Sequence, residues 1–239
     1  MDAAAAGRAI GSNDVSATPR IAYLALGDSY TIGEGVAPEG RWPMRLAAAL
    51  RERGIAIDDP RIVARTGWTT DELSAAIDAE FGDRKESVES EDAARDAPPT
   101  FGFVTLLIGV NNQYRGRSVE EYAEQFEALL ERAIGFADGR ADRTMVLSIP
   151  DWGVTPFAAQ TGRDTVRIAQ ELDAFNAAAQ AICARRGAAF ADIAPIARAH
   201  GGEAAMLADD GLHPSDAMYA LWADAALPTA LRLLRNETR

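Results

Sequence analysis

The chain has little of several residue types that mark particular classes of protein, and each shortage excludes something. A single cysteine, Cys183, rules out an internal disulfide and a thiolate metal cluster. Its place in a helical pattern of apolar residues predicts a buried core position instead of a catalytic thiol. The 24 Lys and Arg are outnumbered by 36 Asp and Glu, and the net charge of -12 argues against a nucleic-acid partner, since phosphate binding needs clustered cations.

Long apolar segments are also absent from the sequence. No stretch approaches the ~18 apolar residues of a membrane span, and residues 1–19 lack the apolar core of a signal peptide. We therefore expect no membrane insertion, and a cytoplasmic location. No amphipathic anchoring segment or broad apolar lid is recognisable, which disfavours lipase action on long-chain esters at an interface.

What is present predicts one α/β domain. The length of 239 residues, with 48% hydrophobic residues, suffices for one sizeable core. We expect a flexible segment over residues 1–19, a single domain over residues 20–239, and a charged, exposed insertion over residues 82–99.

Strand-like and helix-like segments alternate along this domain, which predicts a parallel sheet with helices on both faces. The expected strands are Ile21–Leu26, Arg61–Ala64, Phe101–Ile108, Thr144–Ile149 and Ala188–Asp192. The expected helices are Trp42–Arg53, one that opens at Thr69, Val119–Phe136, Asp164–Arg186 and Asp216–Leu234, while Pro150–Gly162 is expected to be a loop. Sites in such sheets form where strands end, so the residues that follow each strand are the ones to inspect.

A serine follows the first expected strand in the segment Gly27-Asp28-Ser29-Tyr30. A hydrolase that attacks carbonyl carbon needs a nucleophile held at the edge of a rigid scaffold, and Ser29 has that position. Asp28 is expected to brace the turn by accepting a hydrogen bond from a nearby backbone amide.

A serine nucleophile needs a base, and the chain has only two histidines. His213 lies in Asp210-Gly211-Leu212-His213-Pro214, where a tight turn can fold Asp210 back onto the imidazole and fix its tautomer. His200 has no such partner and is expected to lie in a surface loop. Asp151 is a rival to Asp210, ranked lower because its sequence gives no proximity to His213.

Attack on an ester carbonyl builds negative charge on its oxygen, which preorganised donors stabilise. The backbone N–H of Ser29, the backbone N–H of Gly67 and the side-chain amide of Asn111 are the expected donors. Gly67 and Asn111 each follow an expected strand, as Ser29 does.

Together these segments resemble the SGNH hydrolases, also called the GDSL lipase/esterase family. The family's four named residues match Ser29, Gly67, Asn111 and His213, in the family's order and over most of the chain. The matching blocks read Gly-Asp-Ser-Tyr-Thr, Arg-Thr-Gly-Trp-Thr, Gly-Val-Asn-Asn and Asp-Gly-Leu-His-Pro. The resemblance implies a flavodoxin-like three-layer α/β/α sandwich with a parallel central sheet, a Ser-His-Asp triad, a three-donor oxyanion hole, and neither metal nor cofactor.

Two departures from the family pattern are mild. Tyr30 stands where the family name has Leu, and Asn112 follows Asn111 where Asp is common. Trp68, Trp152 and Phe157 lie on loops at the expected site and are candidate walls of a substrate pocket. The expected activity is hydrolysis of small soluble carboxylic esters, with short-chain acyl or acetyl groups, through an acyl-enzyme.

Two alternatives use the same fold. A flavodoxin-like nucleotide or FMN carrier would hold phosphate in the loop after the first strand, but it leaves Asn111 and His213 unexplained. A metal-dependent phosphoesterase would use Asp28, Asn111, Asp210 and His213, although two-metal sites normally draw on more His and carboxylate ligands. The sequence leaves the natural substrate and the oligomeric state open.

Overall fold

The computed structural model of the chain describes residues 19–82 and 99–235. The expected flexible segment 1–19 and charged insertion 82–99 therefore lie outside the described residues, apart from Pro19, Gly82 and Pro99. Five parallel strands form one sheet, in the order β2-β1-β3-β4-β5. They are β1 (Tyr23–Gly27), β2 (Arg61–Ala64), β3 (Phe103–Leu107), β4 (Thr144–Leu147) and β5 (Ala189–Ala191). This is the flavodoxin-like order, so the predicted fold class is confirmed.

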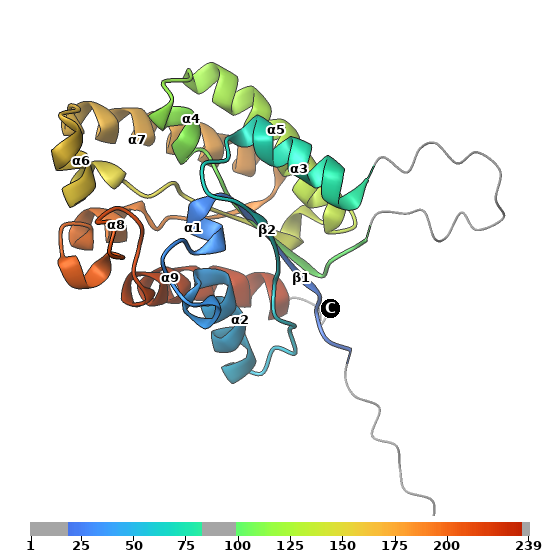
Figure 1. Cartoon of the computed structure of the whole chain (residues 1–239). Coiled ribbons are helices and arrows are strands. Elements are labelled where there is room, and N and C mark those ends of the chain that lie inside the picture. The colour runs from blue at the N-terminus through green and yellow to red at the C-terminus, as the bar shows by residue number, and fades with distance from the viewer. Residues whose placement is uncertain (1–18, 83–98, 236–239) are drawn as a thin grey trace, which may run out of the picture.

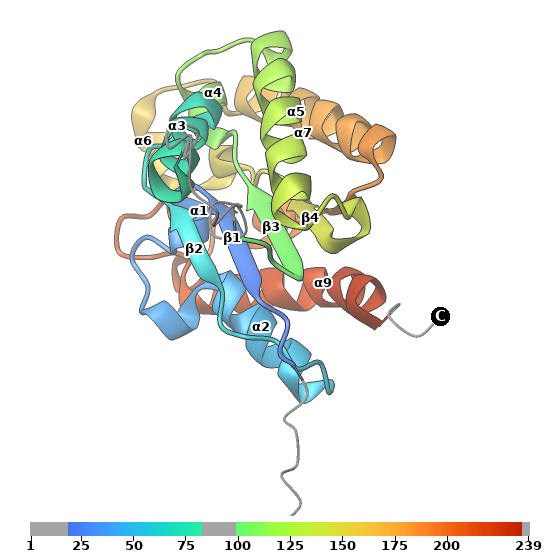
Figure 2. The same cartoon turned by 90° about the vertical axis from the view of Figure 1, so that its right-hand side faces the viewer.

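Helices cover both faces of the sheet and make the other two layers (Figure 1). On one face lie α3 (Thr70–Phe81), α4 (Val110–Tyr114), α5 (Val119–Phe136) and α7 (Thr165–Arg186). On the other face α2 (Trp42–Glu52) packs against α9 (Asp216–Arg235), and the view turned by 90° shows the same division (Figure 2). The shorter helices are α1 (Ser29–Ile32), α6 (Pro156–Thr161) and α8 (Ala194–His200), with 3₁₀ turns at Pro38–Gly40, Ala141–Arg143, Trp152–Val154 and Ala204–Met206.

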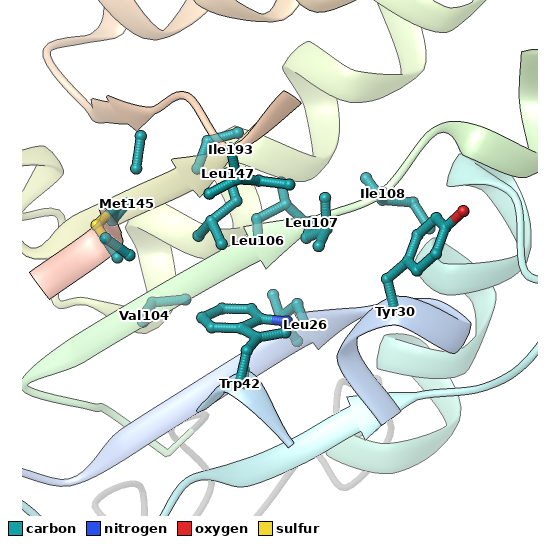
Figure 3. Close-up of a cluster of buried hydrophobic side chains, with 14 of the residues drawn as sticks. Leu26, Tyr30, Trp42, Val104, Leu106, Leu107, Ile108, Met145, Leu147 and Ile193 are labelled. Atoms are coloured by element: carbon teal, nitrogen blue, oxygen red, sulfur yellow. The ribbon is translucent and has the colours of Figure 1, made fainter. Parts of the chain in front are cut away.

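The core explains the apolar runs in the sequence. Every residue of β1 and β3 is buried, as expected for central strands covered on both faces. Figure 3 shows part of the resulting cluster, which runs from Leu26 and Trp42 across β3 to Leu147 and Ile193. Cys183 belongs to the same core, which confirms its predicted place.

Polar residues fix the ends of the helices. Thr69 and Glu72 form a reciprocal capping box at the start of α3, and Asp164 accepts hydrogen bonds from two amides at the start of α7. These capped helices begin within a residue of the predicted positions.

Residues 150–162 were expected to form a loop, and this expectation is wrong. The segment contains the 3₁₀ turn Trp152–Val154 and helix α6. Thr155 caps α6 by accepting a hydrogen bond from the amide of Ala158, and Pro156 supplies a preset φ at its first position. A helix of six residues is too short for its apolar period to stand out in the sequence.

Candidate active site

The residues singled out in the sequence meet at the carboxyl ends of β1, β2 and β3. The chain leaves β1 toward β2 and leaves β3 toward β4, in opposite directions across the sheet. The carboxyl ends of β1 and β3 therefore form its topological switch point, where α/β proteins bind ligands. Here the surface encloses a cavity of about 200 Å³. Its walls include Ser29, Gly67, Asn111 and His213.

Ser29 is the first residue of α1, directly after β1. Asp28 caps this helix, since its Oδ1 accepts a hydrogen bond of 3.0 Å from the amide of Tyr30. Gly27 is required just before it, because a Cβ there would lie 2.4 Å from the carbonyl oxygen of Leu107 on β3. The close approach of β1 and β3 therefore sets where the Ser29 side chain leaves the sheet.

The Asp28 carboxyl is fully enclosed beneath this turn. Burial raises its pKa to about 7, against the smaller opposing effect of the hydrogen bond from Tyr30. The expectation that Asp28 braces the turn agrees with these contacts.

His213 and Asp210 form a compact unit before α9. The Asp210 Oδ2 lies 2.5 Å from Nδ1 of His213, and its Oδ1 accepts hydrogen bonds of 2.9 Å from the amides of Leu212 and His213. Partial burial works to raise the pKa of Asp210, but these hydrogen bonds hold it below its usual value. Because Nδ1 faces Asp210, Nε2 is the ring nitrogen left for a group in the cavity.

Asp151, the rival to Asp210, has a different partner. Its Oδ2 accepts a hydrogen bond of 2.9 Å from Nε of Arg198, and its Oδ1 accepts one from the amide of Gly153. The side chain is therefore a buried structural acceptor that holds the 3₁₀ turn at Trp152–Val154.

The loops that carry Gly67 and Asn111 are tied to each other. Asn111 Nδ2 donates a hydrogen bond of 2.9 Å to the carbonyl oxygen of Trp68, and Nη2 of Arg115 donates one of 2.7 Å to the carbonyl oxygen of Gly67. Asn112 is buried and bonds both the amide and the hydroxyl of Thr70. The Asn that departs from the family pattern thus anchors α4 to the start of α3.

Each of the three expected oxyanion-hole donors, Ser29, Gly67 and Asn111, has an N–H group that is not used in a hydrogen bond within the described residues. Within the described ranges 19–82 and 99–235, the amides of Ser29 and Gly67 donate no hydrogen bond. Asn111 uses one of its two side-chain hydrogens on Trp68. Three N–H groups in one cavity are the arrangement that can stabilise a developing oxyanion.

Aromatic and aliphatic side chains form the rest of the cavity wall. Trp152 and Phe157 line it, as the sequence predicts, whereas Trp68 is not among its lining residues and packs against the core. Four further apolar residues of the cavity wall were not predicted from the sequence, although Val110 directly precedes Asn111 and Leu212 directly precedes His213. These residues are Tyr30, Val110, Tyr114 and Leu212.

His200 differs from its expected place in a surface loop without a partner. It is the last residue of α8, and its Nδ1 lies 2.8 Å from Oε1 of Glu203. The carboxylate three residues later in the sequence was the available signal. His200 is not part of the cavity wall.

The described residues lack two features that other classes of protein require. They contain no group of three or more His, Cys, Asp or Glu side chains arranged to hold a metal ion. In the same ranges, the helices all fall short of the length and apolarity that a bilayer crossing requires.

Comparison with protein families supplies the deciding observation. The sequence profile of the GDSL-like Lipase/Acylhydrolase family matches residues 25–221, which include every residue of the cavity wall. The chain belongs to this family. As a GDSL-like acylhydrolase it is a carboxylic ester hydrolase. Family membership therefore favours the predicted ester hydrolysis over the two alternatives, the FMN carrier and the metal-dependent phosphoesterase.

Solved structures share the fold of this GDSL-like hydrolase at low sequence identity. The crystal structure of TesA is 20% identical and has a TM-score of 0.63, with 89% of this chain and 99% of that chain covered. The family 3 carbohydrate esterase of Clostridium thermocellum is 19% identical, with a TM-score of 0.63 and coverage of 91% and 98%. Axe2, an acetylxylan esterase from Geobacillus stearothermophilus, is 18% identical, with a TM-score of 0.57 and coverage of 92% and 97%. A search of the curated proteins finds no match to the sequence.

Proposed function

We propose that this GDSL-like hydrolase is a serine esterase that cleaves small soluble esters with acetyl or short-chain acyl groups. The observation that carries the proposal is the unit of Asp210 and His213, which shares one cavity with Ser29 and has a contact of 2.5 Å between Oδ2 and Nδ1. A histidine oriented in this way can take the proton of a serine hydroxyl.

The reaction proceeds in two halves. Ser29 Oγ attacks the ester carbonyl carbon while His213 Nε2 accepts the hydroxyl proton, and the carbonyl electron pair moves onto oxygen. The amides of Ser29 and Gly67 and the Asn111 side chain stabilise this oxyanion. Collapse of the intermediate expels the alcohol, which takes the proton from His213 and leaves an acyl group on Ser29.

Water completes the cycle by the same route. His213 removes a proton from the water, the resulting hydroxide attacks the acyl carbon, and Ser29 leaves with the proton returned from His213. The ionised Asp210 stabilises the imidazolium that forms in both halves of the reaction. Because the pKa of Asp210 is lowered, its carboxylate stays ionised at neutral pH.

The size and chemistry of the cavity support a small acyl group. A volume of about 200 Å³ lies below the ~300–1,000 Å³ typical of sites for drug-sized ligands, and the wall is mostly apolar. The proposal also agrees with two neighbours of the same fold, which are named as an acetylxylan esterase and a carbohydrate esterase.

Hydrolysis of p-nitrophenyl acetate by the wild type and by Ser29→Ala tests the proposal. We expect the variant to lose at least ~10³-fold in kcat, because the nucleophile is gone, while EDTA leaves the wild-type rate unchanged. Ser74→Ala is the matched control, since Ser74 bonds Arg132 on α5 and does not line the cavity.

A series of p-nitrophenyl esters from acetate to decanoate sizes the acyl site. We expect kcat/KM to fall beyond about four to six carbons, because a longer chain exceeds the cavity. Equal activity in wild type and Ser29→Ala, or a rise in kcat/KM toward decanoate, would contradict the proposal.

A further inference from the structure

A second hollow, of about 420 Å³, adjoins the catalytic cavity and carries three arginines. We name it the arginine cleft and define it by Arg115 on the α4 side and Arg163 and Arg167 at the start of α7. Tyr114 lines both the catalytic cavity and the arginine cleft, so the two hollows adjoin at this residue. A molecule that holds its ester bond at Ser29 can therefore reach the arginines.

The carboxylates of the arginine cleft are already engaged. Glu171 accepts a hydrogen bond of 2.7 Å from Gln113 Nε2 and one of 2.7 Å from Arg167 Nε, and these contacts lower its pKa. Asp164 caps α7 by accepting hydrogen bonds from the amides of Val166 and Arg167. Neither acidic residue forms an ion pair with Arg163, whose charge acts on Glu171 only as a smaller, longer-range contribution to its lowered pKa.

Arg163 is held in position but retains free donors. Its Nη1 donates a hydrogen bond of 2.9 Å to the carbonyl oxygen of Tyr114, and its guanidinium lies 4.1 Å from the centroid of the Tyr114 ring and 5.7 Å from that of Trp152. In the described part of the chain Arg163 has no ion pair, and its Nε and Nη2 donate no hydrogen bond. A stacked guanidinium with free N–H groups can bind a planar carboxylate by two parallel hydrogen bonds.

The charge balance points to a single negative charge on the ligand. Arg115 pairs with Glu72 at 3.1 Å and Arg167 with Glu171 at 2.7 Å, so among the described residues of the cleft Arg163 is the one arginine without an ion pair. A monoanion would balance this charge, whereas a dianionic phosphate would exceed it.

We propose that the arginine cleft binds a carboxylate on the alcohol part of the ester, with Arg163 as the residue that determines this specificity. The inference rests on the proposed function, in which the small cavity takes the acyl group and the alcohol part extends beyond it. The preferred substrates are thus acylated hydroxy acids, and hydrolysis releases the free hydroxy acid together with the short acid.

The test compares charged and neutral esters of the same shape. Values of kcat/KM are measured for 4-acetoxybenzoate and 4-acetoxybenzamide with the wild type, Arg163→Gln, Arg163→Lys and Arg232→Gln. Arg232 is the matched control, because it is an exposed arginine of α9, on the other face of the sheet (Figures 1 and 2).

We expect Arg163→Gln to lower kcat/KM for the charged ester by about three- to tenfold, the size of a partly exposed ion pair with hydrogen bonds. The rate with the neutral ester should change by less than about twofold, Arg163→Lys should restore part of the loss, and Arg232→Gln should leave both rates alone. Comparing each variant with the wild type cancels the intrinsic reactivity of the two esters. An equal effect of Arg163→Gln on both esters would overturn the inference while leaving the esterase proposal intact.

Binding to the Ser29→Ala variant separates the inference from the chemistry. We expect calorimetry to give tighter binding of 4-acetoxybenzoate than of 4-acetoxybenzamide, with the difference lost when Arg163→Gln is added and reduced by salt. Equal binding of the two, or tighter binding of 4-acetoxyphenyl phosphate, would overturn the carboxylate assignment. A failure of the esterase proposal would appear separately, as activity that survives Ser29→Ala.

Discussion

At the scale of single residues, Asn111 and Asn176 show two settings of the same side chain, one in the wall of the cavity and one bonded to the backbone of Ile149. Asn111 lines the cavity, and its Nδ2 donates one hydrogen bond to the carbonyl oxygen of Trp68. On α7, Oδ1 of Asn176 accepts a hydrogen bond of 2.7 Å from the amide of Ile149, and its Nδ2 donates one of 2.9 Å to the carbonyl oxygen of Ile149. Each side-chain amide therefore has one N–H left over, but only Asn111 lines the catalytic cavity, whereas the amide oxygen of Asn176 is also bonded to the backbone.

The pair gives a prediction about turnover. Asn111→Ala should lower kcat by about 10²–10³ with a small change in stability, because one oxyanion donor is lost. Asn176→Ala should lower the free energy of unfolding by about 1–3 kcal/mol and leave kcat near the wild-type value, because it leaves two buried backbone groups unpaired. Kinetics with p-nitrophenyl acetate and urea unfolding measure both effects. An unchanged kcat in Asn111→Ala would remove Asn111 from the oxyanion hole.

Asp28 gives a prediction about pH and stability. Its pKa is about 7 in the fold, against the ordinary value of 3.8. Between these values the native chain holds a proton that the unfolded chain has lost, so this group's contribution to the free energy of unfolding decreases as pH rises from about 4 to about 7. Asp28→Asn removes the titration and retains an oxygen that can accept the hydrogen bond from Tyr30.

Urea unfolding at pH 5 and pH 8 tests this sign. The free energy of unfolding of the wild type should fall by about 2–3 kcal/mol more between the two pH values than that of Asp28→Asn. Parallel behaviour of the two proteins would show that the Asp28 carboxyl is not enclosed as the structure has it.

At the scale of elements, the turn from β3 into α4 decides where Asn111 lies. Gly109 occupies this turn with a φ of 129°, and an added Cβ would lie 2.5 Å from Cε2 of Tyr122 and 2.8 Å from Cδ1 of Ile149. Both neighbours belong to the packed core and have little room to move.

Gly109→Ala should therefore destabilise the protein by about 2–4 kcal/mol and lower kcat, because α4 must shift away from the cavity. Gly116→Ala is the control for backbone strain alone, since Gly116 also has a positive φ, of 72°, but no atom within 4 Å of an added Cβ. Its cost should be about 1 kcal/mol, without loss of kcat. Equal costs for the two variants, measured by urea unfolding, would mean that packing at Gly109 does not set the path of α4.

At the scale of the whole molecule, the only cysteine reports on the integrity of the core. Cys183 is a buried core residue of α7 with 1% exposure, and burial raises the pKa of its thiol to about 12. A buried, protonated thiol does not react with disulfide reagents.

We therefore expect no reaction of native protein with 5,5′-dithiobis(2-nitrobenzoate) at pH 8, and one thiol per chain in 6 M guanidinium. The denaturant midpoint for thiol exposure should coincide with that for loss of circular dichroism, because the α7 core opens only when the molecule unfolds. Rapid labelling of the active enzyme would contradict the enclosed position of Cys183.

Apolar periodicity and capping residues in the sequence determined the fold class and most element boundaries. The strand Arg61–Ala64 and the helix Val119–Phe136 have the predicted bounds. The long amphipathic stripe of the helix has few other ways to be buried. Short elements escaped prediction, since α4, α6 and α8 have 5, 6 and 7 residues and bury too few side chains to show a period.

Local sequence motifs likewise determined which residues would come together at the site. Ser29, Gly67, Asn111 and His213 each follow a strand or precede the last helix, and parallel strands bring such positions to one edge of the sheet. The unit of Asp210 and His213 is set within four residues of sequence, so its contact needed no distant partner.

Tertiary structure alone decided everything that depends on contacts between distant loops. It paired Asp151 with Arg198, packed Trp68 against the core outside the cavity wall, and brought Tyr114 into that wall. It also brought Arg163 over Tyr114, from segments that no local pattern connects. The physical reason is that motifs and periodicity describe forces between near neighbours in sequence, whereas the shape and charge of a binding surface arise from side chains that meet only after the layers have packed.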